Sequence, residues 1–356
     1  MPYLEISRQN FFSNYQAIFQ TIAPNNPEKI AIVLKDNAYG HGILQIAELA
    51  HIAKIPTAFV KNTKEALSIA HLFRDITILY PNSLPDEKSL QIALKTPNIH
   101  FCVSSLEALQ TYPSATSIEL KVNSGMHRNG ISADDLTQAF KIIQKRNLRL
   151  KGIFTHNGYG DVLSSAFYTQ NEEFLAIKKE SLRLCTHHNI PRPRFHSLSS
   201  SGAIRTNPLN ANLPEVLQDD LFRIGIAFYG YDCSSLKYPR LRPIAALYAN
   251  KISSLCLKKG ASIGYNGVST LQEDTVVSSY DIGYGDGLFR LREGMELHSA
   301  EGFKIFPQVS MDCISIQSNA QKVCIFNDVS AFAKAFQTIP YEILVHLQPH
   351  IPRIVV

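Results

Sequence analysis

Short apolar runs alternate with segments of helical periodicity over the first two-thirds of the chain. Eight of these runs have the length and the near-continuous apolar content of strands that are buried on both faces of a parallel sheet. They lie at 29–35, 57–60, 76–80, 99–104, 117–123, 150–156, 194–199 and 222–228. Intervening segments such as 43–53 carry apolar residues at the three- and four-residue spacing of amphipathic helices. Eight strand–helix units within residues 1–232 predict a closed (β/α)8 TIM barrel rather than an open doubly wound sheet.

The pattern changes near residues 231–243. Beyond this point, short β-like runs follow one another with turns between them, and no long amphipathic periodicity separates them. We therefore expect two domains, a barrel over residues 1–232 and a mainly β domain over residues 233–356.

Composition narrows the functional classes. The chain has 356 residues, 45% of them hydrophobic and 18% charged, and a net charge of +5 without any long block of Lys or Arg, so it gives no indication of binding nucleic acid or a membrane surface. No apolar stretch reaches the roughly 18–20 residues of a membrane span, and the first residues do not resemble a secretory signal. The six cysteines are scattered, without metal-ligand spacing. We expect a cytoplasmic protein with reduced thiols and no metal site.

Polar residues collect where the predicted barrel strands end. Lys35 ends the first strand, Lys121 lies in the fifth near its end, and His156 ends the sixth. Serines 199–201 follow the seventh strand, and Arg223 lies in the eighth. In such barrels the carboxyl ends of the strands carry the active site, so these residues are expected to meet at one mouth of the barrel.

Lys35 admits two interpretations. A lysine at a strand end usually extends to solvent, but a desolvated lysine near other cations can form a Schiff base. The small-residue loop 199–201 and the Arg-x-Gly at 223–225 offer a seat for a phosphate, which barrels often bind at this position. A lysine beside a phosphate seat suggests pyridoxal 5'-phosphate as the cofactor.

The stretch "VLKDNAYGHG" at 33–42 resembles the cofactor motif of the alanine racemases, V-x-K-A-N-A-Y-G-H-G. Eight further motifs of that family follow in matching order, and together they make the resemblance very specific. They are "KVNSGMHRNG", "GIFTHNGYGD", "HSLSSSGAIR", "FRIGIAFYG", "SIGYNGVST", "DIGYGDG", "VSMDC" and "HIPRIVV".

The resemblance implies a fold-type III pyridoxal-phosphate enzyme that works as a homodimer with shared active sites. Lys35 would hold the cofactor and act as acid and base on one face of the substrate α-carbon. Tyr265, supplied by the β domain of the partner subunit, would act on the opposite face. Two groups on opposite faces of a planar carbanion suit racemisation.

The resemblance assigns the remaining roles residue by residue. Cofactor contacts would come from Lys35, Tyr39, His156, Ser200, Arg223, Gly225 and Ile226; substrate contacts would come from Arg128, Met311 and Tyr284. Lys121 occupies a position that is often carbamylated in relatives. Arg223 would face the pyridine nitrogen and, because arginine stays protonated, would make the ring a weaker electron sink than an acidic partner would.

Five positions depart from the family pattern. They are Asp36 for alanine, Ser199 for asparagine, Ile224 for proline, Gln308 for an arginine near the substrate entrance, and Pro349 for a phosphate-binding tyrosine. If the backbone continues as a strand, alternation turns Asp36 away from the cofactor. At Pro349 we expect the phosphate contact to be missing.

These observations favour a racemase that interconverts L- and D-alanine and supplies D-alanine for peptidoglycan. Three alternatives stay open: a decarboxylase of the same fold type, a racemase with a broader choice of small amino acids such as serine, and a non-catalytic pyridoxal-phosphate carrier. The tyrosine in "IGYNG" argues against the decarboxylase, and the β domain argues against the carrier.

Overall fold

A computed structural model describes residues 1–81, 86–232, 234 and 241–356, without the side chains at 206–211. The chain divides into two compact units. The larger unit contains residues 12–35 and 47–241, and the other contains residues 1–11, 36–46 and 242–356. Each unit is described by itself.

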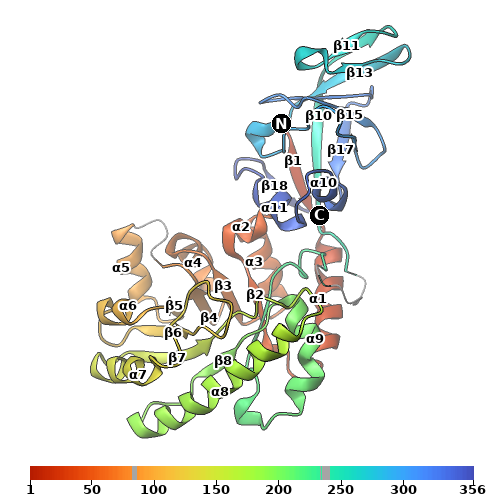
Figure 1. Cartoon of the computed structure of the whole chain (residues 1–356). Coiled ribbons are helices and arrows are strands. Elements are labelled where there is room, and N and C mark those ends of the chain that lie inside the picture. Colours follow the sequence, from red (N-terminus) through yellow and green to blue (C-terminus); the bar gives the residue numbers. More distant parts are fainter. Residues whose placement is uncertain (82–85, 233, 235–240) are drawn as a thin grey trace. The chain divides into compact units, whose positions relative to one another are not determined.

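The larger unit is a nearly closed barrel of eight parallel strands, in the order β8-β7-β6-β5-β4-β3-β2-β9 (Figure 1). The strands are β2 Ile30–Val33, β3 Thr57–Val60, β4 Asp75–Ile78, β5 Ile99–Val103, β6 Ser117–Lys121, β7 Arg149–Phe154, β8 Arg194–His196 and β9 Phe222–Ile224. Between the segments of β8 and β9, backbone hydrogen bonds run from Asp220 N to Phe195 O (2.7 Å) and from Arg223 N to Leu198 O (3.1 Å). All eight predicted strands and the TIM-like barrel are confirmed.

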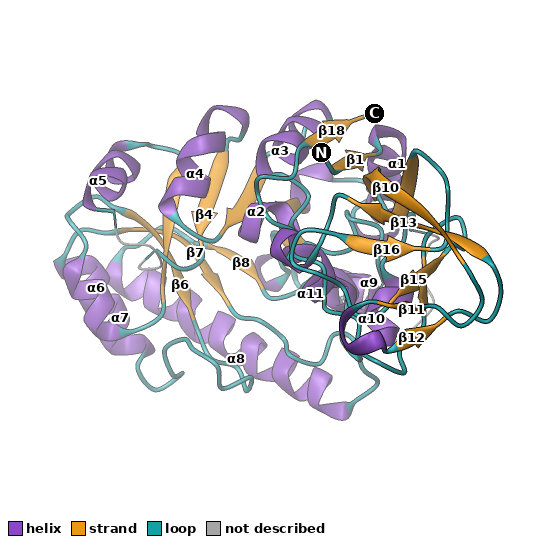
Figure 2. Cartoon of the chain, turned by 90° about the horizontal axis from the view of Figure 1, so that it is seen from above, coloured by secondary structure: helices purple, strands orange, loops and turns teal. Residues whose placement is uncertain are grey.

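Helices follow the strands in the alternation that the periodicity predicts. Figure 2 shows α4 to α8 on the outside of the barrel strands. The helices of the first 211 residues are α1 Arg8–Ile22, α2 Lys35–Tyr39, α3 Ile43–Ile52, α4 Thr63–Ile69, α5 Glu87–Lys95, α6 Leu106–Thr111, α7 Leu136–Lys145, α8 Ser165–His188 and α9 Ser200–Ala211. Several begin at side chains that accept a backbone N–H of the first turn, such as Asn62 before α4 and Ser105 before α6.

The second unit is mainly β, as predicted. Its larger sheet has the order β14-β15-β16-β13-β10-β1-β18, with β17 paired to β10, and β11 pairs with β12. These strands are β1 Tyr3–Ile6, β10 Ala245–Leu257, β11 Ser262–Ile263, β12 Ser269–Thr270, β13 Thr275–Tyr280, β14 Leu297–His298, β15 Lys304–Phe306, β16 Ile314–Ile316, β17 Lys322–Phe326 and β18 Arg353–Val355. Short helices α10 Ser330–Ala335 and α11 Pro340–Val345 complete it, and the chain has 3-10 turns at Pro27–Lys29, Ala70–Leu72, Glu215–Leu217, Tyr265–Gly267 (η4) and Tyr284–Asp286 (η5).

The N-terminal strand β1 belongs to this second sheet, although the hydrophobic pattern groups it with the barrel. It pairs antiparallel with β10 (Leu4 opposite Leu247) and parallel with β18 (Leu4 opposite Arg353). Leu4 and Ile6 are fully buried, so burial against strands that lie far away in sequence determines where this segment packs.

Candidate active site

Four basic side chains converge on the mouth of the barrel, as the strand ends predict. Lys35 follows β2, Lys121 ends β6, and Arg223 lies in β9. His156 follows β7, and burial together with the charges of Arg223, Arg128, Lys121 and Lys35 lowers its pKa to about 3. His156 is therefore neutral near pH 7, in a site whose field favours an anionic ligand.

Lys121 shares this field. Burial lowers the pKa of the Lys121 ammonium to about 8, with Arg128, Arg223 and Lys35 acting in the same direction and the nearby Cys102 opposing them. A lysine with such a pKa is partly neutral at physiological pH, which makes its amine more reactive than a solvent-exposed one.

Arg223 is fixed by three hydrogen bonds below the mouth. One terminal nitrogen donates to His196 Nδ1 (2.5 Å), and the other donates to the carbonyl oxygens of Thr155 (2.7 Å) and Ser197 (3.1 Å). Burial lowers the pKa of the guanidinium to about 10, against the opposing charges of Asp219 and Glu119. Arg223 therefore stays a cation and a hydrogen-bond donor near neutral pH.

The loop after β8 meets the turn after β9. Ser200 begins helix α9, and its Oγ accepts a hydrogen bond from the backbone N–H of Gly225 (3.2 Å). Ile226 follows and is buried. A hydroxyl and backbone amides at the start of a helix form the kind of seat that binds phosphate, so the structure brings together the residues that the resemblance assigns to that group.

The turn after Lys35 is left-handed. Asp36, Asn37, Ala38 and Tyr39 have φ between 52° and 55°, a region that side chains other than Gly, Asn and Asp rarely adopt. The expectation of an extended backbone at Asp36 is therefore wrong. Asp tolerates this conformation better than Ala does, which gives its presence there a local reason.

Tyr39 lies in the second unit with residues 36–46. Its side chain is buried, its ring centroid is 5.7 Å from that of Tyr341, and burial raises the pKa of its hydroxyl. Its contact with a cofactor phosphate stays a prediction.

Tyr265 and Met311, which the resemblance places in a partner's active site, and Tyr284, an expected substrate contact, are exposed on the β unit. Tyr265 is 56% exposed, Tyr284 40% and Met311 54%. Tyr265 begins η4 and Tyr284 begins η5. Backbone N–H groups of Tyr284 and Gly285 donate to the carbonyl oxygens of Ser310 (3.0 Å) and Met311 (2.8 Å), so these two segments lie side by side.

The structure shows the contacts or the exposure of three residues that depart from the family pattern. Gln308 Oε1 accepts a hydrogen bond from Arg290 (2.7 Å), and both residues line a cavity of about 1030 Å³ in the β unit. Pro349 is exposed in the loop before β18. Ile224 is buried in β9 opposite Ile32 of β2.

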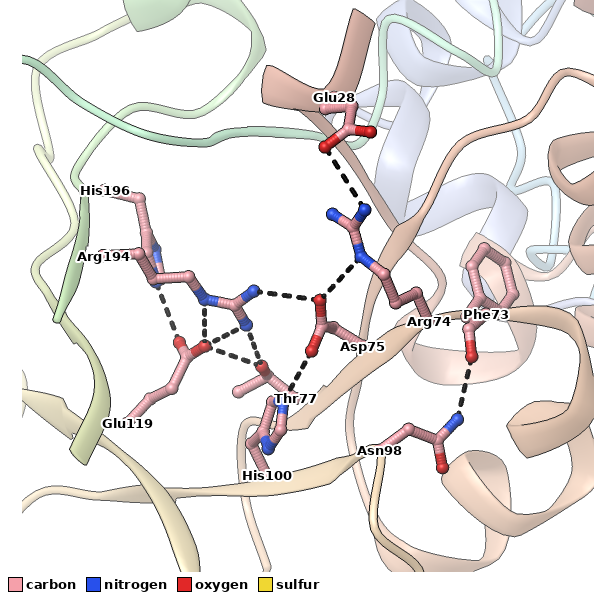
Figure 3. Close-up of polar contacts among 10 residues, drawn as sticks. All are labelled: Glu28, Phe73, Arg74, Asp75, Thr77, Asn98, His100, Glu119, Arg194 and His196. Carbon is pink, nitrogen blue, oxygen red and sulfur yellow. Dashed lines mark hydrogen bonds and ion pairs between the residues drawn. The ribbon is translucent and has the colours of Figure 1, made fainter. Parts of the chain in front are cut away.

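Sequence reasoning missed a polar cluster inside the barrel (Figure 3). Glu119, fully buried on β6, contacts Arg194 and His196 of β8 and Thr77 of β4. The signal was present, because "SIELK" and "RFH" place ionisable residues within short strands that are otherwise apolar enough to be buried on both faces. Residues two apart in a strand point to the same face, so Glu119 and Lys121 share one face of β6, and Arg194 and His196 share one face of β8. In a barrel this face can be the interior.

Other site types find less support within the described residues. No group of three or more His, Cys, Asp or Glu side chains there could hold a metal ion. None of the described helices combines the length and apolarity needed to cross a membrane. Cys102, Cys185, Cys256, Cys313 and Cys324 are free thiols, and Cys233 lies outside the described residues.

Comparison with known proteins matches nearly the whole chain. Residues 6–233 match the profile "Alanine racemase, N-terminal domain", and residues 244–355 match "Alanine racemase, C-terminal domain". The chain is 37% identical to an alanine racemase of a Nitratiruptor species over 355 residues, which is 99% of each chain. It is 35% identical to one from Campylobacter jejuni subsp. doylei over 356 residues, which is 100% of each chain. The chain belongs to the alanine racemase family.

Solved alanine racemase structures share this fold. The alanine racemase of Clostridium difficile 630 superposes with a TM-score of 0.84 at 22% identity, covering 100% of this chain and 95% of that one. The Bacillus anthracis alanine racemase with bound L-Ala-P gives a TM-score of 0.82 at 24% identity, with the same coverage. The resemblance identified from the motifs and the fold predicted with it are therefore confirmed.

Proposed function

We propose that this member of the alanine racemase family is a pyridoxal-phosphate-dependent enzyme that interconverts L- and D-alanine. The observation that carries the proposal is the cationic mouth of the barrel. There, one neutral histidine, His156, has its pKa lowered by burial and by four nearby cations, which are Lys35, Lys121, Arg128 and Arg223. The names of the curated relatives support alanine as the substrate.

The residues present fit pyridoxal phosphate. Ser200 Oγ, at the start of helix α9, lies 3.2 Å from the amide nitrogen of Gly225 in the turn after β9, which suits the phosphate. Lys35 supplies the primary amine that this cofactor needs, and Arg223 supplies a fixed donor for the pyridine nitrogen. When bound, the cofactor withdraws electrons from the substrate and thereby acidifies its α-proton.

Two protein groups exchange that proton in the proposed mechanism. Lys35 takes or returns it on one face of the α-carbon, and Tyr265 of a second copy of the chain does so on the other face. A free tyrosine has a pKa of about 10, so Tyr265 needs a neighbour that accepts its proton. Neutral His156 has an available ring nitrogen lone pair for that role.

Arg223 determines how strongly the site stabilises the substrate carbanion. Because its pKa of about 10 keeps it protonated at neutral pH, it would donate a hydrogen bond to the pyridine nitrogen without transferring its proton. The electron withdrawal is then moderate, which favours rapid return of a proton over side reactions.

The working form in this proposal is a cytoplasmic homodimer with two shared sites. Its supporting observation is the exposure of Tyr265, Tyr284 and Met311 on the β unit, far above that of buried core residues. Arg128 and Met311 would then contact the substrate from different copies, and the D-alanine formed would serve peptidoglycan synthesis.

Incubation with L- or D-alanine in deuterated water tests the proposal. The holoenzyme should convert each enantiomer to the racemate with deuterium at the α-carbon, and the Lys35→Ala variant should do neither. Release of carbon dioxide from an amino acid would indicate a decarboxylase, and absence of turnover would refute the racemase. The same assay with serine measures the breadth of specificity.

A further inference from the structure

A continuous chain of hydrogen bonds runs from Arg223 into the interior of the barrel. Arginine can only donate hydrogen bonds, so His196 Nδ1 must accept the one from Arg223 (2.5 Å) and carry no proton. The other ring nitrogen, Nε2, then carries the proton and donates a hydrogen bond to Glu119 Oε2 (2.8 Å). His196 and Glu119 are both 0% exposed, so water does not compete for these bonds.

The second carboxylate oxygen of Glu119 also serves only as a hydrogen-bond acceptor. Oε1 receives hydrogen bonds from Arg194 Nε (2.7 Å), from a terminal nitrogen of Arg194, and from Thr77 Oγ1 (3.1 Å). Figure 3 shows how Arg194 and His196 approach the two oxygens of Glu119 separately. Both oxygens therefore face donors, and this position requires an acceptor on each side.

We propose that Glu119 is a positioning residue that holds His196 in its Nε2–H tautomer and thereby fixes Arg223 at the mouth of the barrel. The inference rests on the proposed function for the role of Arg223 toward the cofactor. The tautomer itself follows from the hydrogen bonds among Glu119, His196 and Arg223.

The electrostatics agree with this assignment. Burial lowers the pKa of His196 to about 4, although Glu119 opposes the shift, so the ring is neutral at pH 7. Burial would raise the pKa of Glu119, but Arg194 and His196 outweigh it and hold that pKa well below its usual range. A neutral imidazole between a carboxylate and a guanidinium satisfies both partners in only one tautomer, in which the nitrogen facing the carboxylate carries the proton.

Glu119→Gln tests the requirement for a hydrogen-bond acceptor on both sides of this position, because the oxygen of an amide accepts hydrogen bonds and its NH2 group only donates them. If the amide oxygen faces His196, its NH2 faces the donors of Arg194. If the NH2 faces His196, the ring must switch tautomer and present Nδ1–H to Arg223, which is also a donor. Removing the opposing donor in Glu119→Gln/Arg194→Met lets the oxygen face His196, with Thr77 Oγ1 as an acceptor for the NH2.

The primary measurement is the ¹⁵N spectrum of histidine side chains in the cofactor-free protein, with His196 assigned by comparison with His196→Gln. The native protein should show a protonated Nε2 and an unprotonated Nδ1. Glu119→Gln should lose this pattern and the double variant should regain it. A native spectrum with Nδ1–H would overturn the proposal on its own, even if the single variant failed to fold.

The holoenzyme gives a second readout. Glu119→Gln should bind pyridoxal phosphate about tenfold more weakly, shift its absorption band and lower kcat more than KM, and Glu119→Gln/Arg194→Met should recover most of each change. Glu28→Gln, at the exposed outer end of the same cluster, should match the native protein. Unchanged cofactor affinity and absorption in Glu119→Gln would refute the positioning role. Because the tautomer is measured without cofactor or substrate, its result does not depend on whether the protein is a racemase.

Discussion

Gly40 lies where the turn after Lys35 packs closely against the last turn of helix α11. It has φ of 82°, and a Cβ at this position would lie 2.0 Å from the carbonyl oxygen of Leu344 and 2.8 Å from its carbonyl carbon. The Gly40 carbonyl also accepts hydrogen bonds from Arg353 Nε (3.1 Å) and from a terminal nitrogen of Arg353 (2.9 Å). We predict that Gly40→Ala destabilises the protein strongly.

Two contributions set the magnitude. The left-handed backbone costs an alanine about 1–2 kcal/mol. The overlap with Leu344 involves rigid backbone atoms, and relieving such overpacking costs about 1–3 kcal/mol more. Any loss of the Arg353 hydrogen bonds adds to this sum, because bonds to a charged donor contribute about 1.5–3 kcal/mol. The backbone strain and the overlap together should therefore lower the free energy of unfolding by roughly 2–5 kcal/mol.

Gly302→Ala is the matched control. Gly302 lies in the same unit and has φ of 86°, but a Cβ there would meet nothing within 4 Å. It carries the backbone strain without the steric overlap. In thermal unfolding of the cofactor-free protein, Gly40→Ala should unfold about 5–10 °C below Gly302→Ala. Equal midpoints would refute the close approach of Gly40 to Leu344 as a determinant of stability.

Three further outcomes are expected. Tyr265→Phe should slow racemisation about 10²–10⁴-fold with an unchanged cofactor absorption spectrum, and normal turnover would exclude Tyr265 as a base. Mixing inactive Lys35→Ala and Tyr265→Phe chains should restore part of the activity by forming one intact shared site, whereas no recovery would contradict sites built from two copies. Acidification from pH 6.5 toward 3 should lower the unfolding midpoint of the cofactor-free protein. The lowered pKa of His156 means that the unfolded state binds a proton at a higher pH than the folded state does. His156→Gln should reduce this decline, and an identical decline in that variant would refute the contribution of His156 to it.

The barrel could be predicted because its strands are apolar on both faces. Such runs stand out from helical periodicity even when they are only four residues long, as β2 and β3 are. Strand β1 gave no comparable signal. Its residues pair with residues 245–248 of β10 and 353–355 of β18, and no local pattern encodes partners so distant in the chain.

The candidate site was predictable where function places polar residues at strand ends. Lys35 and Lys121 follow that rule, whereas Arg223 lies within β9. The roles expected of their neighbours came from the resemblance to the alanine racemases. The left-handed turn at Asp36 was not predictable from alternation, because the strand ends before it. The bonds of Glu119 join strands β4, β6 and β8 and depend on which face of each strand is interior, so only the closed barrel reveals them.

The depth of each basic group in the barrel explains its protonation. Arg223 has buried carboxylates beneath it: Glu119 acts through His196, and Asp219 accepts the Ser197 N–H (2.9 Å) while Ser197 O accepts from Arg223. Their charges oppose the effect of burial and leave the pKa of Arg223 at about 10. Lys121 lies higher, where Arg128, Arg223 and Lys35 add to the effect of burial and bring its pKa to about 8. The carboxylates therefore keep one cation permanently charged below the mouth, while the cations above it make a second amine able to lose its proton near neutral pH. In the proposed function, a cation that holds the cofactor and an amine open to carbamylation have opposite requirements: the carboxylates of Asp219 and Glu119 oppose the effect of burial at Arg223, whereas neighbouring cations add to it at Lys121.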